Sequence, residues 1–422
     1  MNAIYRIAFI SAHTSPLARL GSREAGGMNV YVRKLSEELA RRGFCVDIFT
    51  RRTDRDSPET IVLAEGLRVV HLAAGPAQPL PKEDLPHYLE AFEESLLRFQ
   101  QAQNLNYDLL HSHYWLSGSV AERLKVRWRV PHVAMFHTLG EVKNRARITE
   151  REPPLRIEAE RAVVRGANRI VCASEHEKQL LVELYGARPH CIAVVPCGVD
   201  LDLFQPMDKE EARRRLGLRD HERIILFVGR IEPLKGVDIL IGAAAQLHGQ
   251  EDFYLLIVGG DGHARSEMTH LQRLASGLGI DHHVSFIGPV DHERLPLFYN
   301  AADVCVVPSF YESFGLVAVE AMACGTPVVA SRVGGLTVTV RDGETGYLVP
   351  WQCAEPFAER LELLLGNREL RRALGRTARE QMHRFRWASV AEGVIKVYRD
   401  LLEATAAAPC GSLTGALPPP SG

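Results

Sequence analysis

Short, almost wholly apolar runs alternate with amphipathic segments through most of this sequence. Such runs are typical of strands that are buried on both faces of a parallel sheet, while the segments between them have the periodicity of covering helices. The alternation predicts an α/β fold with a mostly parallel sheet up to about residue 197. The runs in this half are Ile4–Ile10, CVDIFT, LRVVHL, DLLHSH, HVAMFHT, NRIVCAS and IAVVPCG.

The pattern starts again after a polar connection at residues 198–222. Further strands are predicted at RIILFVGR, YLLIVGG, HVSFIGPV, ADVCVVPS and TPVVAS, with helices between them that include one from about Val237. We therefore expect one Rossmann-like domain at residues 1–200 and a second at residues 201–384. Residues 406–422 have too little apolar bulk to fold and are expected to form a disordered tail.

A glycine pair, Gly26-Gly27, lies between the first strand and an amphipathic helix that ends near Gly43. Strand, glycine loop, helix and strand in succession are typical of a doubly wound fold, where glycines let the backbone approach a phosphate. The spacing is not that of the dinucleotide fingerprint, which disfavours an NAD site. A glycine pair taken alone is more often a tight helix entry than a ligand site.

The segment PSFYESFGLVAVEAMACGTPVVAS contains two carboxylates in a strand–loop–helix–strand unit. Glu312 lies in the loop, and Glu320 lies among apolar residues of the helix, where a buried acid needs hydrogen-bond donors such as sugar or ribose hydroxyls. The alternative is a helix-start acid together with one satisfied core acid. The backbone N–H groups at the start of this helix suit an anion such as a pyrophosphate, and they belong to Phe314, Gly315 and Leu316.

Two cations and a histidine follow other buried strands. Arg230 and Lys235 occur in the loop of FVGRIEPLKG, and two cations suit the charge that grows on a leaving diphosphate. Solvated surface cations are the alternative. His137 ends the strand HVAMFHT, where a lone histidine is more often structural than functional. No carboxylate pair of the kind that glycosidases use is evident.

Composition narrows the class of protein further. The 422 residues suffice for two domains, and the net charge of −2 gives no reason to expect a nucleic-acid partner. The eight cysteines are scattered singly without zinc or redox spacing, as expected of a reducing cytoplasm. The N-terminus lacks a cationic signal-peptide start, and no apolar run approaches membrane-spanning length. The expected location is therefore cytoplasmic.

The segment from Pro308 to Ser331 resembles the signature of the retaining glycosyltransferases of family 4, which have the GT-B fold. The resemblance implies two Rossmann-like domains that face each other across a cleft and a helix at residues 385–405 that crosses back to the first domain. It implies that Glu312 faces the donor sugar, Glu320 binds the nucleotide ribose, and His137 contacts the sugar near the reacting carbon. The other implied donor-site residues are Gly27, Arg230, Lys235, Val290, Phe314, Gly315 and Leu316.

A narrower resemblance rests on ISAHTSPLARLGSREAGGMNVYV, LPKEDLP, YDLLHSHYWLSG and FHTLGEVKN. These segments are similar to the mycothiol-pathway subfamily, which transfers N-acetylglucosamine from UDP to inositol 3-phosphate. Lys82 and Arg156 would then be two cations for one phosphate. Residues 144–161 are richer in arginine than in that subfamily, which leaves the acceptor open. The implied acceptor residues are His13, Glu24, Ala25, Gly26, Met28, Asn29, Lys82, Tyr114, Thr138 and Arg156.

We therefore predict a retaining UDP-sugar-dependent transferase that acts on a small phosphorylated acceptor and requires no metal or other cofactor. Asp200 and Asp202 match the Asp-x-Asp pattern of metal-dependent glycosyltransferases, but their place in a linker favours coincidence. The alternatives are a sucrose-phosphate-synthase-like or generic hexosyltransferase, a UDP-sugar epimerase and a non-catalytic nucleotide-sugar sensor. An epimerase would leave the acceptor cations unexplained. The resemblance also makes a homodimer the assembly to test.

Overall fold

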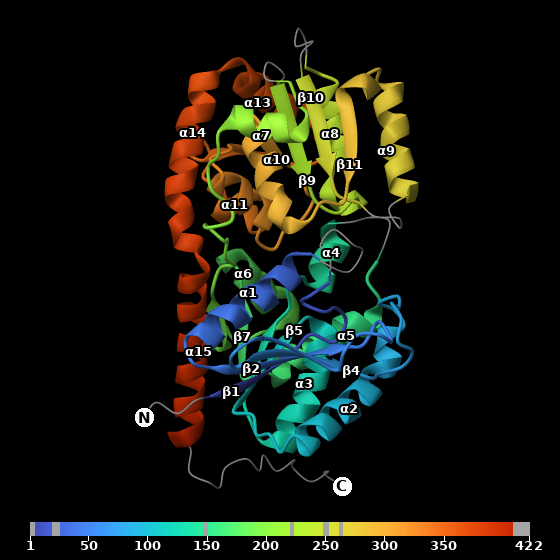
Figure 1. Cartoon of the computed structure of the whole chain (residues 1–422), viewed down its shortest axis with the longest axis vertical. Coiled ribbons are helices and arrows are strands. Elements are labelled where there is room, and N and C mark those ends of the chain that lie inside the picture. The colour runs from blue at the N-terminus through green and yellow to red at the C-terminus, as the bar shows by residue number, and fades with distance from the viewer. Residues whose placement is uncertain are drawn as a thin grey trace, which may run out of the picture.

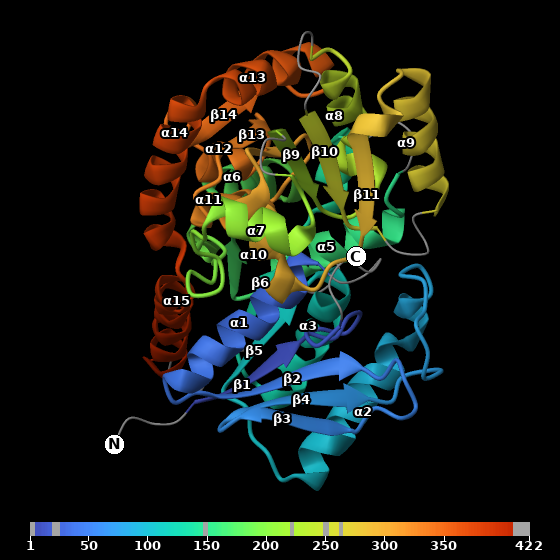
Figure 2. The ribbon, with the colours of Figure 1, turned by 45° about the horizontal axis from the view of Figure 1, so that its top comes forward.

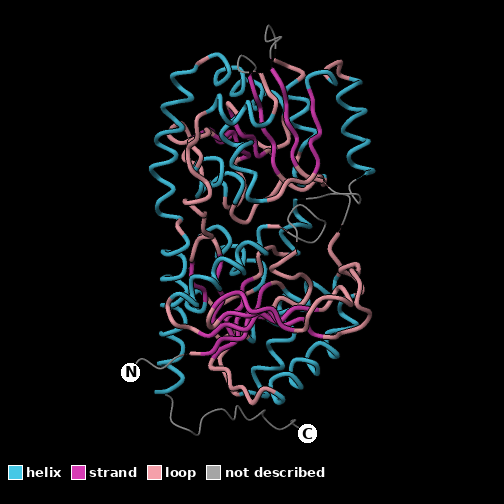
Figure 3. The backbone as a smooth tube through the Cα atoms, in the orientation of Figure 1, coloured by secondary structure: helices cyan, strands magenta, loops and turns pink. Residues whose placement is uncertain are grey.

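The computed structural model describes residues 5–18, 26–146, 151–219, 223–247, 253–260 and 265–407. Two of the predicted acceptor residues, Glu24 and Ala25, and the predicted tail from position 408 onward lie outside these ranges. The described chain forms two α/β bodies stacked along the long axis of the molecule (Figure 1). Figure 3 shows the strands gathered into two separate groups, one in each body.

The first domain contains an eight-stranded sheet in the order β3-β4-β2-β1-β5-β6-β7-β8. All neighbouring pairs are parallel except β3 and β4, so the prediction of a mostly parallel sheet is confirmed. Strand β3 was not predicted, because TIVLA at this edge is half-exposed and lacks the uniform burial of the other strands. The strands are β1 Arg6–Ile10, β2 Cys45–Arg51, β3 Thr60–Ala64, β4 Leu67–Leu72, β5 Leu109–His113, β6 His132–Met135, β7 Arg169–Cys172 and β8 Ile192–Val194.

Helices cover both faces of this sheet: Figure 1 shows α1 on one side of β1, β2 and β4 and shows α2 and α3 on the other, while Figure 2 shows β1, β2, β4 and β3 side by side. Helix α1 buries Tyr31, Val32, Leu35 and Leu39 against the strands, as expected from its amphipathic pattern. The helices are α1 Gly27–Arg41, η1 Leu85–Tyr88, α2 Leu89–Ala102, α3 Trp115–Trp128, α4 Gly140–Ala146, α5 Pro154–Gly166, α6 Glu175–Tyr185 and η2 Pro189–Cys191.

The second domain contains a parallel six-stranded sheet in the order β11-β10-β9-β12-β13-β14. Its strands are β9 Arg223–Val228, β10 Phe253–Val258, β11 Val284–Gly288, β12 Val304–Val307, β13 Val328–Ser331 and β14 Gly346–Val349. Its helices are α7 Lys209–Leu216, η3 Pro233–Lys235, α8 Val237–Ala244, α9 Arg265–Gly277, η5 Asp281–His283, η6 His292–Arg294, α10 Leu295–Ala301, α11 Leu316–Ala323, α12 Leu336–Thr339, α13 Ala354–Gly366 and α14 Arg368–Gln381.

The chain passes between the domains twice, and the two passages touch. After α14 and η7 (Met382–Phe385), α15 (Trp387–Ala407) runs down beside the first domain and packs on α1 (Figure 1). Val199 in the first passage pairs with Arg386 in the second. A Cβ at Gly198 would lie 2.4 Å from the Trp387 ring, so only glycine fits this crossing. Among the described helices, none is long and apolar enough to cross a membrane.

Candidate functional site

A cavity of about 320 Å³ lies between the domains, where the carboxyl ends of both parallel sheets face each other. This is the position at which open α/β sheets bind ligands. It brings together most of the predicted site residues from segments far apart in the sequence. Those that line it are His13, Gly26, Gly27, Met28, Asn29, Lys82, Tyr114, His137, Thr138, Arg230, Lys235, Val290, Glu312, Phe314, Gly315, Leu316 and Glu320.

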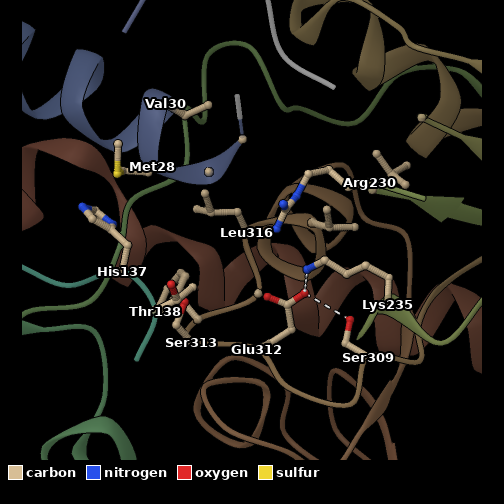
Figure 4. A pocket seen from close by; sticks show the side chains of 18 of the residues that line it. Met28, Val30, His137, Thr138, Arg230, Lys235, Ser309, Glu312, Ser313 and Leu316 are labelled. Carbon is tan, nitrogen blue, oxygen red and sulfur yellow. Dashed lines mark hydrogen bonds and ion pairs between the residues drawn. The ribbon is translucent and has the colours of Figure 1, made fainter. Parts of the chain in front are cut away.

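Lys235 and Glu312 form an ion pair at the second-domain wall of the cavity, and Ser309 Oγ donates to Glu312 Oε1 over 3.1 Å (Figure 4). The two loops that carry them meet at Gly236, whose φ is +65° and whose Cβ would lie 2.2 Å from the Pro308 carbonyl oxygen. Only glycine permits this approach. The side chains of the pair remain 17% exposed, so both stay within reach of a ligand.

Arg230 lies on the same wall and pairs with Glu232 over 3.0 Å. Both cavity cations on this wall thus have carboxylate partners. Helix α11 begins beside them after Gly315, whose φ of +89° would strain any other residue. The N-terminus of α11 therefore points its first backbone N–H groups toward the cavity, which suits an anionic ligand.

The start of α1 meets the start of α11 across the cavity. A Cβ at Gly27 would come within 2.7 Å of Leu316 Cδ1, so the two domains approach closely here and a larger residue would displace that side chain. The predicted glycine pair therefore has a packing role at the site as well as a place in its wall.

Glu320 is 6% exposed and has hydrogen-bond donors on both carboxylate oxygens. His292 Nε2 lies 2.8 Å from Oε1, and the Tyr299 hydroxyl donates to Oε2 over 2.8 Å. Burial lowers the pKa of His292, but the Glu320 carboxylate more than offsets this and the net shift is upward. Sequence reasoning found the buried acid and missed both partners, although His292 stands only two positions after Val290.

Two residues of the first-domain wall have left-handed backbone conformations without being glycine. Tyr114 follows β5 with φ of 77°, and His137 follows β6 with φ of 62°. Such conformations are uncommon for these residue types and concentrate at functional sites. The Tyr114 N–H donates to the Met135 carbonyl over 2.8 Å, and this hydrogen bond fixes the backbone of Tyr114 to strand β6.

His137 is neutral at ordinary pH, because burial lowers its pKa to about 3. Its Nε2 lies 3.1 Å from Nδ1 of His113, and the Tyr31 ring meets it edge-on at 5.2 Å. A neutral imidazole in this position can donate a hydrogen bond to a ligand hydroxyl or accept one from it. It cannot contribute a positive charge to the site at neutral pH.

His13 and Asn29 shape the remainder of the first-domain wall. The His13 ring packs on Tyr114 at 4.5 Å, and its pKa is lowered by burial and by the charge of Lys82. The Asn29 amide accepts from the Gly26 N–H over 2.9 Å and donates to Thr14 Oγ1 over 2.8 Å. Asn29 therefore fixes two stretches of backbone that border the cavity.

Arg156 does not reach the cavity surface, in contrast to the other predicted acceptor residues within the described ranges. Its side chain is 2% exposed and lies behind Tyr114 and Thr138. The cation at the wall itself is Lys143 on α4, which sequence reasoning missed although it belongs to the quoted segment FHTLGEVKN. The structure therefore replaces the expected pair of surface cations by Lys82 and Lys143, with Arg156 one layer deeper.

The Asp-x-Asp pair has a structural position in the linker. Asp200 pairs with Lys34 of α1 over 2.9 Å and accepts the backbone N–H groups of Asp202 and Leu203. Within the described ranges, no group of three or more histidine, cysteine, aspartate or glutamate side chains is arranged to hold a metal ion.

Comparisons with known proteins place the chain in a family. Residues 25–203 match the model "Glycosyltransferase Family 4", and residues 208–381 match "Glycosyl transferases group 1". A relative from Acidothermus cellulolyticus, named D-inositol 3-phosphate glycosyltransferase, is 47% identical over 94% of this chain and 90% of its own length. The chain belongs to this glycosyltransferase family. It is an enzyme that transfers a sugar, and its fold is GT-B.

Other members and solved structures agree with this placement. A D-inositol 3-phosphate glycosyltransferase from Mycobacteroides abscessus is 46% identical over 93% of this chain and 88% of its own length. The solved sucrose-phosphate synthase from Thermosynechococcus elongatus is 38% identical, with a TM-score of 0.88, over 95% of this chain and 100% of the solved one. Anabaena HepE, solved with UDP and glucose, shares the fold at 19% identity and a TM-score of 0.76 over 94% of this chain and all of its own.

Proposed function

We propose that this glycosyltransferase moves N-acetylglucosamine from its UDP-sugar to 1D-myo-inositol 3-phosphate with retention of configuration. The observation that carries the proposal is the division of the cavity between two kinds of wall. One wall holds Arg230, Lys235 and the N-terminus of α11, which suit a diphosphate. The other wall holds Lys82 and Lys143 beside neutral hydroxyl and imidazole groups, which suit a phosphorylated polyol.

The ion pair between Lys235 and Glu312 defines the order of events when the donor binds. A donor diphosphate attracts Lys235, and this frees the Glu312 carboxylate to accept hydrogen bonds from sugar hydroxyls. Glu320, already held by His292 and Tyr299, is the acceptor for the ribose diol. Val290 lines the same region and is the residue expected to meet the nucleobase through its main chain.

The transfer itself is a front-face displacement. The bond between the anomeric carbon and the diphosphate oxygen breaks while the acceptor oxygen attacks the same face, and the departing diphosphate takes the acceptor proton. Arg230 and Lys235 stabilise the negative charge that grows on the diphosphate. His137 contacts the sugar as a neutral imidazole, and no metal is needed in this scheme. Closure of the two domains would exclude water and limit hydrolysis of the donor.

A second acceptor, fructose 6-phosphate, is favoured by the 38% identity to a sucrose-phosphate synthase over 95% of this chain. The greater identity to the D-inositol 3-phosphate glycosyltransferases favours the inositol phosphate. Both acceptors carry a phosphate, so the cations of the first-domain wall do not distinguish them.

The test measures UDP release from UDP-N-acetylglucosamine with and without inositol 3-phosphate, beside UDP-glucose with fructose 6-phosphate. Release that depends on inositol 3-phosphate, with the sugar recovered on inositol in the α configuration, is the expected result. Activity confined to the fructose 6-phosphate pair would transfer the assignment to the second acceptor. A β-linked product would contradict the retaining mechanism.

A further inference from the structure

A cluster of alternating charges lies directly behind the first-domain wall. Arg156 Nε donates to Glu160 Oε1 over 2.7 Å, and Arg156 Nη1 lies 2.9 Å from Glu152 Oε2. The other oxygen of Glu152 accepts from Lys143 Nζ. Arg156 Nη2 donates to the carbonyl and hydroxyl oxygens of Thr138, which lines the cavity. The cluster therefore connects the cavity surface at Lys143 and Thr138 to the interior.

The two carboxylates of this cluster differ in their surroundings. Glu160 has a fully buried side chain and accepts from the Gly140 N–H over 3.0 Å and from the Tyr185 hydroxyl. It is a fixed part of the domain. Glu152 precedes α5, its side chain is 20% exposed, and each of its oxygens meets a cation. Burial raises its pKa, but Arg156 and Lys143 more than offset this, so the net shift is downward and Glu152 is ionised at neutral pH.

The charges explain why a carboxylate occupies this position. Arg156 is almost completely buried, and Lys143 is 27% exposed beside it. The buried guanidinium needs nearby anions, and Glu160 contacts only one side of it. Glu152 supplies a second negative charge between Arg156 and Lys143. An acceptor phosphate at this wall would need Lys143, because carboxylate and phosphate oxygens compete for the same ammonium group.

We propose that Glu152 is a specificity-determining residue whose carboxylate, held by Arg156, stands in for the acceptor phosphate on the cavity cation Lys143 until the acceptor displaces it. This inference rests on the proposed function, since it concerns the phosphate of the transferase acceptor. An acceptor with a phosphate replaces the lost ion pair on Lys143 with a new one. An acceptor without a phosphate leaves Glu152 in place and gains nothing from Lys143, so the exchange selects for phosphorylated acceptors.

Under this proposal, neutralising Glu152 should lower the acceptor KM, whereas replacing an ordinary binding or structural residue would raise it. Glu152→Gln removes the competing negative charge, so the KM for inositol 3-phosphate should fall about two- to fivefold, within the worth of one surface ion pair. The kcat and the KM for UDP-N-acetylglucosamine should change less than about twofold, because both cations of the donor wall are unaffected. Lys143→Met should raise the acceptor KM and reduce the preference for inositol 3-phosphate over inositol.

Glu158→Gln is the matched control, because Glu158 is an exposed residue on α5, the helix that follows Glu152, and the variant makes the same change in net charge. It should leave the acceptor KM unchanged. A fall of equal size in both variants would show a general effect of charge and would overturn the proposal. A rise in the acceptor KM for Glu152→Gln, or no change in a variant that unfolds at the wild-type temperature, would also overturn it.

A binding measurement separates this inference from the assignment of the reaction. Inorganic phosphate should raise the unfolding temperature of the full-length Glu152→Gln protein more than that of the wild type. In the variant, no internal carboxylate competes with phosphate for Lys143. If the wild type shows no turnover that depends on a phosphorylated acceptor, the proposed function fails while this difference can still be observed. If turnover is present and phosphate stabilises both proteins equally, the inference about Glu152 fails alone.

Discussion

The two walls of the cavity solve different electrostatic problems. On the second-domain wall, Lys235 and Glu312 are each 17% exposed and face the space a ligand would fill. On the first-domain wall, the guanidinium of Arg156 is 2% exposed and held against the fully buried Glu160. A partly exposed pair can exchange partners when a diphosphate arrives, whereas a buried pair must be kept intact for the domain to fold. Charge therefore acts directly on ligands at the second-domain wall, whereas the first-domain wall combines surface lysines with a buried ion pair that supports them from behind.

The largest effect is expected when the buried Arg156–Glu160 pair is broken. Arg156→Met should reduce the free energy of unfolding by about 3–5 kcal/mol, because it leaves Glu160 as a buried and uncompensated carboxylate. Urea unfolding followed by circular dichroism measures this. Arg161→Met, at an exposed position of the same helix, should stay within about 0.5 kcal/mol of the wild type. Equal losses of unfolding free energy in the two variants would contradict the claim that the buried Arg156–Glu160 pair supports the first domain.

Because the Lys235–Glu312 pair is partly exposed and faces the cavity, replacing Lys235 should reduce activity with little loss of stability. Lys235→Met should lower kcat/KM by about 10²–10³-fold, the size expected when one group that stabilises transition-state charge is removed. Its free energy of unfolding should fall by no more than about 1 kcal/mol, because the ion pair with Glu312 is partly exposed. Initial rates and urea unfolding of the same preparation give both values. A large stability loss would mean that this pair also supports the fold.

A smaller and more selective effect is expected for the lysine on the first-domain wall. Lys82→Met should raise the KM for inositol 3-phosphate about 10–100-fold, the range for a hydrogen bond to a charged group. The KM for the UDP-sugar should be nearly unchanged, because Lys82 lies in the first domain. Steady-state rates with each substrate varied in turn separate the two effects. A parallel rise in both KM values would contradict the assignment of Lys82 to the acceptor.

The smallest effect concerns the neutral histidines of the first-domain wall. The pKa of His137 is lowered by burial to about 3, so only the unfolded state binds this proton when the pH falls below about 6.5. Acidification to pH 5.5 should therefore remove about 1.4 kcal/mol of stability through His137 alone. His137→Asn, which suits the left-handed backbone there, should reduce the stability loss between pH 7.5 and 5.5 by this amount.

His292 provides the opposite sign in the same experiment. The net upward shift of its pKa means that its ion pair with Glu320 stabilises the fold below about pH 6.5 and is lost as the pH rises through the folded-state pKa. His292→Gln should therefore make the stability loss on acidification larger. If the two histidine variants change the pH dependence in the same direction, the burial and pairing described for them are wrong.

The sequence predicted the sheets, the strand ends and the segments that meet at the cavity, because apolar strands and glycine loops are local signals. It did not predict the edge strand β3, whose half-exposed residues lack a clear alternation. It placed Arg156 at the cavity, whereas the structure places it behind Tyr114 and Thr138. Depth of this kind depends on how α5 packs against α3 and α4, and no local pattern records it.

The partners of Glu320 illustrate the same limit on the second domain. The apolar surroundings of Glu320 correctly indicated a buried acid, but the donors that satisfy it come from η6 and α10. His292 and Tyr299 lie 28 and 21 residues before Glu320 in the sequence, so only the tertiary structure brings them to its carboxylate. Lys143 was overlooked for a related reason, since its exposure to the cavity depends on the turn from β6 into α4.

The central claim is that the first-domain wall recognises a phosphate on the acceptor. The most direct measurement compares kcat/KM for inositol 3-phosphate with that for unphosphorylated inositol, with UDP-N-acetylglucosamine as the donor. Two or more charged hydrogen bonds to the phosphate predict a preference of at least about 10²-fold for the phosphorylated acceptor. Equal values for the two acceptors would contradict the account of this wall, whatever the donor wall proves to do.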